Sequence, residues 1–218
     1  IEKMLRMAQN ESEKAFADRS MFMEKYVRNP RHIEFQIFGD KHGNVIHVLE
    51  RECTIQRRYQ KIMEESPSPV LREELRAIMG NAAVKAAKAL NYDNAGTVEF
   101  IYDDTTKDFY FLEVNTRLQV EHPVTEEVTG LDLVKLQIEV AEGKPLPLNQ
   151  EEVIGNGYAI EMRLYAEDPS NDFLPATGLV HLWDVPKVEG LRIETAIKNN
   201  SEISISFIWS SFKGPNCG

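Results

Sequence analysis

The sequence lacks several features that would assign it to whole classes of protein. It has two cysteines, Cys53 and Cys217, which are too few for a disulfide framework and indicate a reducing compartment. No apolar run approaches the roughly 20 residues that a transmembrane helix needs, so we expect no membrane span. A net charge of −10 argues against non-specific binding to nucleic acid or to an anionic membrane.

Two phosphate-binding motifs are also absent. Neither GxGxxG nor GxxxxGK[ST] occurs anywhere, so we expect neither a doubly wound dinucleotide fold nor a P-loop. The chain begins at Ile1, without a methionine and inside a predicted helix. We therefore expect it to be a piece of a longer protein, and the absence of a targeting segment carries no information.

The hydrophobic periodicity predicts an α+β fold. Alternation at every second residue predicts strands, which are separated by turn residues, and apolar spacings of three and four predict helices. Strands are expected over 21–27, 32–38, 45–49, 96–102, 111–123, 158–166, 179–183 and 191–195, and helices over 4–16, 71–90 and 131–142. Residues 50–62 form a basic island, which is most simply a solvated face. Because hairpins are interleaved with helices, we expect a mixed or antiparallel sheet with helices packed on it.

The hairpin formed by 96–102 and 111–123 contains the first candidate site. A turn about Thr106 unites apolar residues on one face through the pairs Tyr102–Tyr110, Phe100–Leu112 and Val98–Val114. The same register sets Glu99 across from Glu113. Like charges opposed across strands destabilise a pair by roughly 0.2–1 kcal/mol, so we expect a divalent cation between them, with Asn115 as a third ligand. Oxygen ligands of this kind suit Mg²⁺ or Mn²⁺.

The second strand of this hairpin continues the polar pattern. Its odd positions are Glu113, Asn115, Arg117, Gln119 and Glu121, which share one face if the backbone is extended, and Pro123 ends the run. The alternative interpretation is an amphipathic strand whose polar side faces water.

Three motifs occur in a fixed order along the chain. They are Asn29-Pro-Arg-His-Ile-Glu34, Gln56-Arg-Arg-Tyr-Gln-Lys61, and the run from Glu113 to Glu126. Together they resemble the signature of the biotin carboxylases, which have an ATP-grasp fold, and the resemblance runs from Glu11 to Ser204. Within that family, 61–65 and 165–173 are most similar to the biotin-containing subunit of the 3-methylcrotonyl-CoA carboxylase type, with the propionyl-CoA carboxylase type as the near competitor.

The resemblance implies the first half-reaction of a biotin-dependent acyl-CoA carboxylase. ATP, Mg²⁺ and bicarbonate form carboxyphosphate, whose CO₂ passes to N1 of biotin on a carrier domain. The implied partner is a carboxyltransferase (beta) subunit in an oligomeric enzyme. The implied setting is leucine breakdown in the mitochondrial matrix.

The resemblance also implies roles for individual residues. Glu99, Glu113 and Asn115 would hold two metal ions, in agreement with the hairpin argument. Lys61 would lie beside the γ-phosphate and bicarbonate, Glu121 would be the general base, and Arg192 would steady the enolate form of biotin. The remaining assignments are Arg117, Gln119 and the backbone of Val120 for bicarbonate, and Glu24, Lys25, Tyr26, Val27, His32, Gln56 and Tyr59 for ATP. Without the resemblance, Lys61 and Arg192 read as surface charges.

The sequence departs from the family pattern in several places. The glycine-rich loop, the nucleotide-binding lysines, the N-terminal lobe and the biotin carrier are not in this sequence. Tyr59 stands where many relatives have histidine. A proline-rich stretch, 144–149, predicts a boundary. We therefore expect three parts: 1–143 from the C-terminal part of an ATP-grasp domain, 144–205 from the start of a biotin carboxylase C-terminal domain, and 206–218 as a divergent tail.

Two alternatives remain open. A different ATP-grasp ligase, such as carbamoyl phosphate synthetase, also places paired carboxylates and Asn on a sheet, but it would lack the register of Arg117, Gln119 and Glu121. Alternatively, a truncated form would act only as an assembly or regulatory module of a carboxylase. We expect the isolated chain not to turn over by itself, and the acyl-CoA acceptor is not encoded in this stretch.

Overall fold

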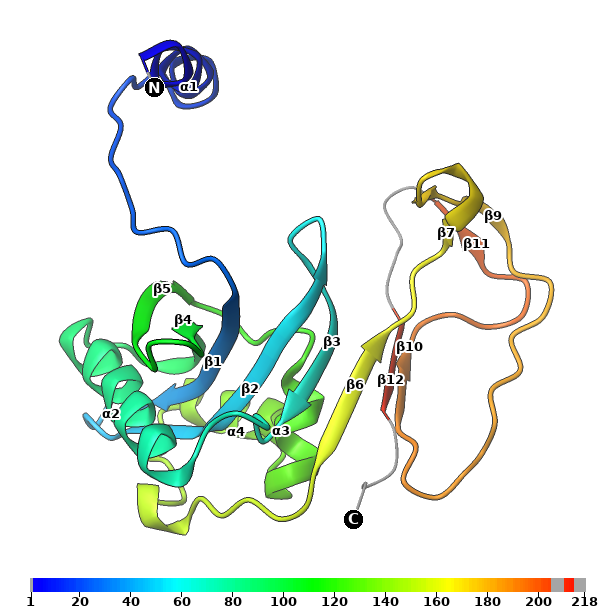
Figure 1. The fold of residues 1–218 in the computed structure, drawn as a ribbon. Coiled ribbons are helices and arrows are strands. Elements are labelled where there is room, and N and C mark those ends of the chain that lie inside the picture. Colours follow the sequence, from blue (N-terminus) through cyan, green and yellow to red (C-terminus); the bar gives the residue numbers. More distant parts are fainter. Residues whose placement is uncertain (1, 205–209, 214–218) are drawn as a thin grey trace.

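The computed structural model describes residues 2–204 and 210–213, and it confirms the α+β class. Its main sheet is antiparallel, with the strand order β10-β12-β6-β3-β2-β1-β4-β5 (Figure 1). The bounds of these strands are β1 (Pro30–Gly39), β2 (Val45–Arg57), β3 (Gln60–Ser66), β4 (Asn94–Asp103), β5 (Phe109–Asn115), β6 (Ala159–Arg163), β10 (Ile193–Thr195) and β12 (Ser210–Lys213).

The helices and the smaller elements complete the fold. The helices are α1 (Glu2–Phe16), α2 (Glu73–Ala89), α3 (His122–Thr129) and α4 (Leu133–Ala141), with 3₁₀ turns η1 (Gln150–Glu152) and η2 (Pro169–Asn171). Two small sheets pair β7 (Glu167–Asp168) with β8 (Leu174–Pro175), and β9 (Gly178–Leu179) with β11 (Glu202–Ile203).

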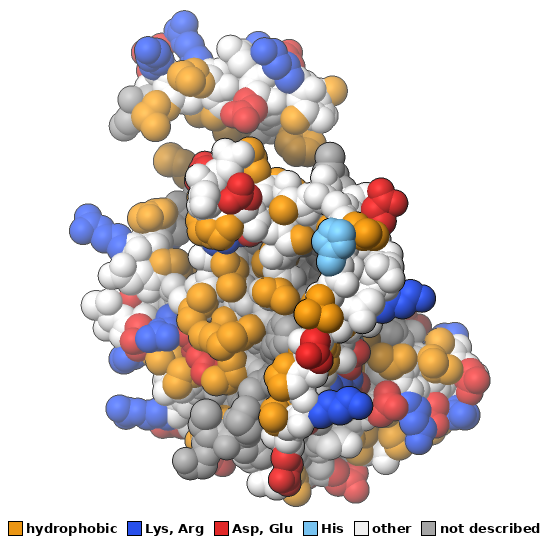
Figure 2. Space-filling model, turned by 90° about the vertical axis from the view of Figure 1, so that its right-hand side faces the viewer, with side chains coloured by type: hydrophobic (Ala, Val, Ile, Leu, Met, Phe, Trp, Pro, Cys, Tyr) orange, Lys and Arg blue, Asp and Glu red, His pale blue; other side chains and the backbone are white. Residues whose placement is uncertain are grey.

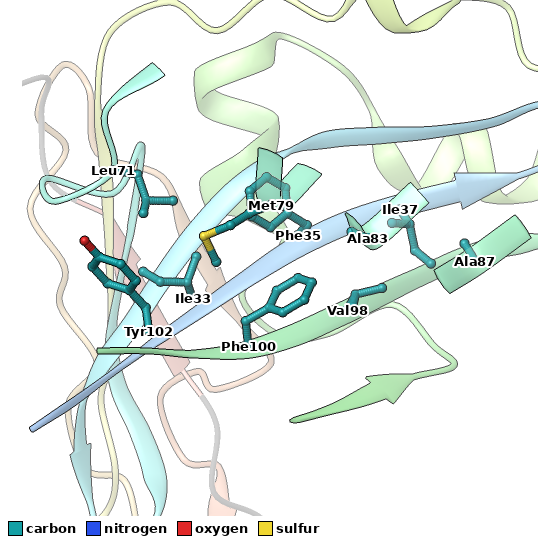
Figure 3. Packing of buried hydrophobic residues seen from close by; sticks show 10 residues of the cluster. All are labelled: Ile33, Phe35, Ile37, Leu71, Met79, Ala83, Ala87, Val98, Phe100 and Tyr102. Carbon is teal, nitrogen blue, oxygen red and sulfur yellow. The ribbon is translucent and has the colours of Figure 1, made fainter. Parts of the chain in front are cut away.

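Helix α2 covers one face of the sheet. Alternate residues of β1 and β4, among them Phe35 and Phe100, pack under Met79, Ala83 and Ala87 of the helix (Figure 3). Ala83 and Ala87 are four residues apart on one side of the helix, and their small side chains let it lie close to the strands. Gly80 lies in the same contact, where a Cβ atom would come within 2.5 Å of His47 Nε2.

Helices α3 and α4 cover part of the sheet face opposite α2, and the rest of that face is open. Leu133, Leu136 and Val140 of α4 pack on Phe38 of β1 and on neighbouring strands, and α3 packs beside β6. The rest of this face carries polar side chains, which is why it can hold a site.

A bulge in β2 decides which side chains reach the polar face. Its register against β1 shifts between Phe35 and Ile37, and Leu49 within the shift has a left-handed φ of 60°. An extra residue inverts the alternation that follows it. Arg51 therefore pairs with Glu34 and turns toward the polar face instead of toward α2.

The predicted hairpin of β4 and β5 is confirmed in part. Glu99 pairs with Glu113 and Val98 with Val114, as predicted, but a bulge then sets Phe100 against Phe111 instead of Leu112. The predicted pairs Phe100–Leu112 and Tyr102–Tyr110 are wrong for this reason. Leu112 is consequently 42% exposed instead of buried in the core.

Three further sequence predictions are wrong. Residues 21–27 form no strand, and Met23 there is 99% exposed. Strand β5 ends at Asn115, so Arg117 and Glu121 do not continue it. Helix α3 was not expected, and it begins beside Pro123, because proline suits the first turn of a helix as well as the end of a strand.

The basic island is not a free solvated face. It forms the end of β2 and the start of β3, and the chain reverses at Arg58 and Tyr59, which have left-handed φ angles of 51° and 64°. Such angles at two adjacent residues match the twist of a tight two-residue hairpin turn.

The two ends of the chain lie outside the helix-covered core. Helix α1 buries no residue and stands apart from the sheet (Figure 1). The C-terminal segment exposes large hydrophobic side chains, among them Leu174 and Leu182, and Figure 2 shows hydrophobic side chains gathered on that side. Residues 206–209 and 214–218 of the expected tail lie outside the described residues. No helix in the described part of the chain is long and apolar enough to cross a membrane.

We predict that Phe35→Ala destabilises the fold by about 3–5 kcal/mol, because it empties a fully buried site. Phe111→Ala is the matched control: Phe111 contacts the same Phe100 ring but is 59% exposed, so a loss of about 1 kcal/mol or less is expected. Urea unfolding of the two variants measures both values. Equal losses would contradict this assignment of the core.

Candidate active site

The polar face opens into a cleft of about 1210 Å³. Its walls are β1, the β2–β3 hairpin, β4, β5 and the loop after β5. Of the residues predicted for the site, the cleft is lined by His32, Gln56, Tyr59, Lys61, Glu99, Glu113, Asn115, Arg117, Gln119, Val120 and Glu121. These positions come from four separate stretches of sequence, so the fold brings them together.

Lys61 of β3 lies at the centre of the polar groups. Its Nζ donates to Glu34 Oε2 at 2.5 Å, Glu121 Oε1 at 2.6 Å and Glu99 Oε1 at 3.0 Å. The ammonium group has three N–H donors, and each one has a carboxylate acceptor. This cluster therefore holds the lysine side chain in one position at the floor of the cleft.

The cluster keeps Lys61 and Glu99 charged. Burial alone would lower the pKa of Lys61, but the surrounding carboxylates outweigh it and raise that pKa. Burial would raise the pKa of Glu99, whereas the hydrogen bond from His32 and the charge of Lys61 lower it to about 2. At neutral pH the site therefore contains an ammonium ion and an ionised Glu99.

A second cation, Arg51, binds Glu34 of the cluster. Arg51 is fully buried, and its Nε donates to Glu34 Oε1 at 2.6 Å. Its other nitrogens donate to Gln36, Thr97, Gln119 and Thr125. Burial opposes the ionised form of Glu34, but the charges of Arg51 and Lys61 outweigh it and lower the pKa of Glu34. Glu34 thus bridges the two cations.

The residues predicted to bind metal lie together at one side of the cleft. Asn115 Nδ2 donates to Glu99 Oε1 at 2.9 Å and to Glu113 Oε1 at 3.2 Å. One atom is thus within reach of both carboxylates, as a bridging cation would be. Rotating the amide would present the oxygen of Asn115 as a ligand. The donor set of two carboxylates and an amide oxygen fits Mg²⁺ or Mn²⁺.

Arg163, at the end of β6, was not among the predicted residues. It lines the cleft, and its Nη2 lies 2.9 Å from Glu121 Oε2 and 2.5 Å from Glu64 Oε1. Burial raises the pKa of Glu64 to about 7, against the opposing charge of Arg163. A guanidinium ion is thus held at the mouth of the cleft beside the proposed base Glu121.

Five of the predicted site residues are not brought into the cleft. Arg192 pairs with Glu126 Oε2 at 2.8 Å and with Glu194 Oε1 at 2.6 Å, and it does not line the cleft. The other four, Glu24, Lys25, Tyr26 and Val27, also lie outside its lining. Tyr26 is 84% exposed, and Lys25 instead donates to Tyr110 Oη. The predicted strand that would have carried these four is absent.

The missed residues carried a signal in the sequence. Glu34 lies on the polar side of the alternating run 32–38, Arg51 lies between two acids in the run 50–62, and Arg163 shares a predicted strand face with Glu161. A charge on a buried strand face needs a partner of opposite sign, so each such position predicts a buried ion pair. The bulge at Leu49, however, could not be placed from the sequence.

We predict that Glu64 makes stability depend on pH. Between about pH 4.5 and pH 7 the folded chain keeps the proton that the unfolded chain has lost. Stability should therefore fall as pH rises through this window, by at most about 3 kcal/mol, and stay lower above it. Arg163, Glu121, Glu161 and Tyr165 surround the group.

Urea unfolding at pH 5 and pH 8 measures this dependence. In Glu64→Gln the difference between the two pH values should shrink, whereas Glu73→Gln, at an exposed position in the first turn of α2, should leave it unchanged. An equal pH dependence in all three proteins would show that Glu64 does not take up the proton.

Comparisons with known proteins show which family the chain resembles. Residues 1–149 match the family described as carbamoyl-phosphate synthase L chain, ATP binding domain, and residues 161–207 match the biotin carboxylase C-terminal domain. The chain is 54% identical over 200 residues to the mitochondrial methylcrotonoyl-CoA carboxylase subunit alpha of Glycine max, covering 92% of this chain and 27% of that protein. It is 51% identical over 189 residues to biotin carboxylase 2 of Bacillus subtilis (strain 168), covering 87% and 42%.

A solved structure has the same fold. The biotin carboxylase domain of the Hydrogenobacter thermophilus 2-oxoglutarate carboxylase, a dimer in complex with MgADP, ADP and bicarbonate, superposes with a TM-score of 0.89. It is 47% identical, and the match covers 97% of this chain and 47% of that chain. The chain thus spans less than half the length of each of these relatives. It belongs to the biotin carboxylase family, within the ATP-grasp fold whose ATP-binding domain matches residues 1–149.

Proposed function

We propose that this chain supplies part of the site at which a biotin carboxylase converts ATP, bicarbonate and biotin into carboxybiotin, ADP and phosphate. The observation that carries the proposal is the position of Lys61, whose ammonium group is fixed by Glu34, Glu99 and Glu121 at the floor of a cleft. The three carboxylates keep this cation in place before any substrate arrives. A preorganised cation stabilises charge that develops on a transferring phosphoryl group without reorganising during the reaction.

The proposed metal ligands are Glu99, Glu113 and Asn115. When bound there, Mg²⁺ or Mn²⁺ would neutralise charge on the phosphate oxygens of ATP. The two acids face each other across β4 and β5, and Asn115 Nδ2 already contacts both. Solved relatives support Mg²⁺, because the Hydrogenobacter domain was crystallised with MgADP. Mn²⁺ and a second ion rest on the chemistry of the donor set alone.

Bicarbonate would bind on the loop after β5. Arg117 lies on the cleft wall, where its side chain is exposed and, among the described residues, donates only to the Leu118 carbonyl oxygen, at 3.4 Å. A guanidinium fork matches the planar oxygens of bicarbonate. Gln119 Nε2 donates to Glu99 at 3.1 Å and so connects this anion site to the proposed metal ligands, and Val120 lines the same wall.

Proton transfer is assigned to Glu121, and the biotin enolate to Arg163. Glu121 is buried, and its two oxygens accept from Lys61 and Arg163. A base between two cations would take a proton from bicarbonate and later from N1 of biotin. Arg163 takes the role expected from sequence for Arg192, because Arg163 reaches the cleft and Arg192 does not. His32, Gln56 and Tyr59 are assigned to the nucleotide wall of the cleft.

The wider setting is proposed from the relatives. Several of them are named mitochondrial methylcrotonoyl-CoA carboxylase subunit alpha, while others are bacterial biotin carboxylases. We assign this chain to an acyl-CoA carboxylase of the methylcrotonoyl type in the mitochondrial matrix, with propionyl-CoA as the competing acceptor. Biotin on a carrier domain and a carboxyltransferase (beta) subunit would complete the enzyme, and the dimeric Hydrogenobacter domain supports an oligomer.

A chimeric enzyme tests the site independently of the parts not in this sequence. Residues 11–204 of this chain replace the matching segment of the Bacillus subtilis biotin carboxylase, and turnover is measured as bicarbonate-dependent ADP release with free biotin. We expect turnover, and we expect Arg163→Ala to lower it by about 100-fold or more, as for loss of one charge-stabilising donor. Arg192→Ala, the matched control, should stay within about threefold of the parent, because the ion pairs of Arg192 lie outside the cleft.

Which of these two variants loses more activity decides which arginine acts on biotin. Loss of activity in Arg192→Ala with little change in Arg163→Ala would return the biotin role to Arg192. A folded chimera that binds Mg²⁺·ATP but releases ADP at the same rate with and without bicarbonate would contradict the proposed function.

A further inference from the structure

We propose that Arg57, together with Glu167 and Phe173, forms a clamp that holds Lys61 in position. The effect of this clamp on the reaction rests on the proposed function. The clamp joins the β2–β3 hairpin to the segment that follows β6. Arg57 is a positioning residue here, since it acts through Lys61.

The hairpin turn needs an outside contact. It reverses at Arg58 and Tyr59, with Arg57 paired to Gln60 and Gln56 paired to Lys61. Tyr59 at its tip is 98% exposed, so its ring does not fix this end of the hairpin by packing. A two-stranded ribbon is marginally stable without packing, and the Lys61 side chain leaves the backbone only two residues from the turn.

The last residue of β6 and the segment that follows it supply that contact at alternate residues. Arg163 reaches Glu64 and Glu121, Tyr165 Oη donates to the Lys61 carbonyl oxygen at 3.0 Å, and Glu167 forms an ion pair with Arg57. Residues i, i+2 and i+4 of an extended chain point to the same side. Arg163, Tyr165 and Glu167 can therefore all contact the β2–β3 hairpin.

The contact at Arg57 is the one at the turn itself. Its guanidinium carbon also lies 4.1 Å from the centre of the Phe173 ring, a cation–π geometry. The side chains of Arg57 and Glu167 are 28% and 14% exposed. The neighbouring pair of Arg58 with Asp172 is 59% and 85% exposed, so solvent screens it and it contributes little. The clamp therefore depends on Arg57.

Small displacements matter at Lys61 because its ammonium group meets three carboxylates within 3.0 Å. A turn released from Glu167 and Phe173 would let β3 shift, and a shift of about 1 Å at a reacting group lowers rates by about 100-fold. The clamp thus makes the geometry at Lys61 depend on residues of the following domain.

The test measures the position of Lys61 directly, in the 218-residue chain and without turnover. Acetic anhydride acylates accessible lysines, and mass spectrometry gives the rate at Lys61 relative to the exposed Lys107. In Arg57→Ala and in Glu167→Gln we expect acylation of Lys61 to be on the order of tenfold faster, as when local opening becomes easier. The charge-swapped double variant R57E/E167R should restore most of the slow rate.

Two further variants serve as controls. Arg58→Ala removes the exposed pair at the same turn and should change the Lys61 rate by less than about twofold. Phe173→Leu keeps an apolar side chain but removes the ring, so we expect the acylation rate of Lys61 to rise by about threefold. This variant tests the clamp even if Arg57→Ala does not fold.

Unchanged acylation of Lys61 in folded Arg57→Ala, Glu167→Gln and Phe173→Leu would overturn the clamp, whatever the chimera does. A clamp effect in a chain whose chimera shows no bicarbonate-dependent turnover would overturn the proposed function alone. An increase in Arg58→Ala equal to that in Arg57→Ala would also overturn the clamp, because it would show that any loosening of the turn exposes Lys61.

Discussion

A buried network of ion pairs between two cations and three carboxylates fixes the geometry of the candidate site. Arg51 and Lys61 share Glu34, and Lys61 also holds Glu99 and Glu121. Desolvating so many charges is expensive, and a buried ion pair stabilises a fold little compared with an apolar core. The network instead fixes the position of Lys61. Each N–H donor of its ammonium group has a carboxylate acceptor, so the cation is held in place in an open cleft. The α2 side of the sheet, packed with aliphatic and aromatic side chains, supplies the stability that the polar side lacks.

The same network connects two parts of the chain that the family comparison separates. Glu121 accepts from Lys61 of the first part and from Arg163 of the second. Strands β3 and β6 are neighbours in one sheet, so the predicted boundary at 144–149 lies between sequence segments that remain joined by backbone hydrogen bonds.

Much of the site was predictable because its strongest signal is local. The apolar faces of β4 and β5 fixed the register near Glu99 and Glu113, and the family motifs identified Lys61 and Glu121. What failed depended on distant or irregular structure. The bulge at Leu49 turns Arg51 toward Glu34, and the sequence around it offers no turn signal. Arg192 was predicted and Arg163 was not, although Arg163 lies on β6, the strand next to β3 of the Lys61 hairpin. The run 21–27 has the composition of a strand but no partner strand to pair with.

In the proposed function, the γ-phosphoryl group of ATP is transferred to bicarbonate beside Lys61. The most direct measurement uses the chimeric enzyme with ATP and ¹⁸O-labelled bicarbonate, followed by mass spectrometry of the released phosphate. Formation and breakdown of carboxyphosphate leave one bicarbonate oxygen on the phosphate, so the account predicts phosphate with one ¹⁸O atom per turnover. Phosphate that carries oxygen only from ATP and water, while ADP is still released, would contradict it.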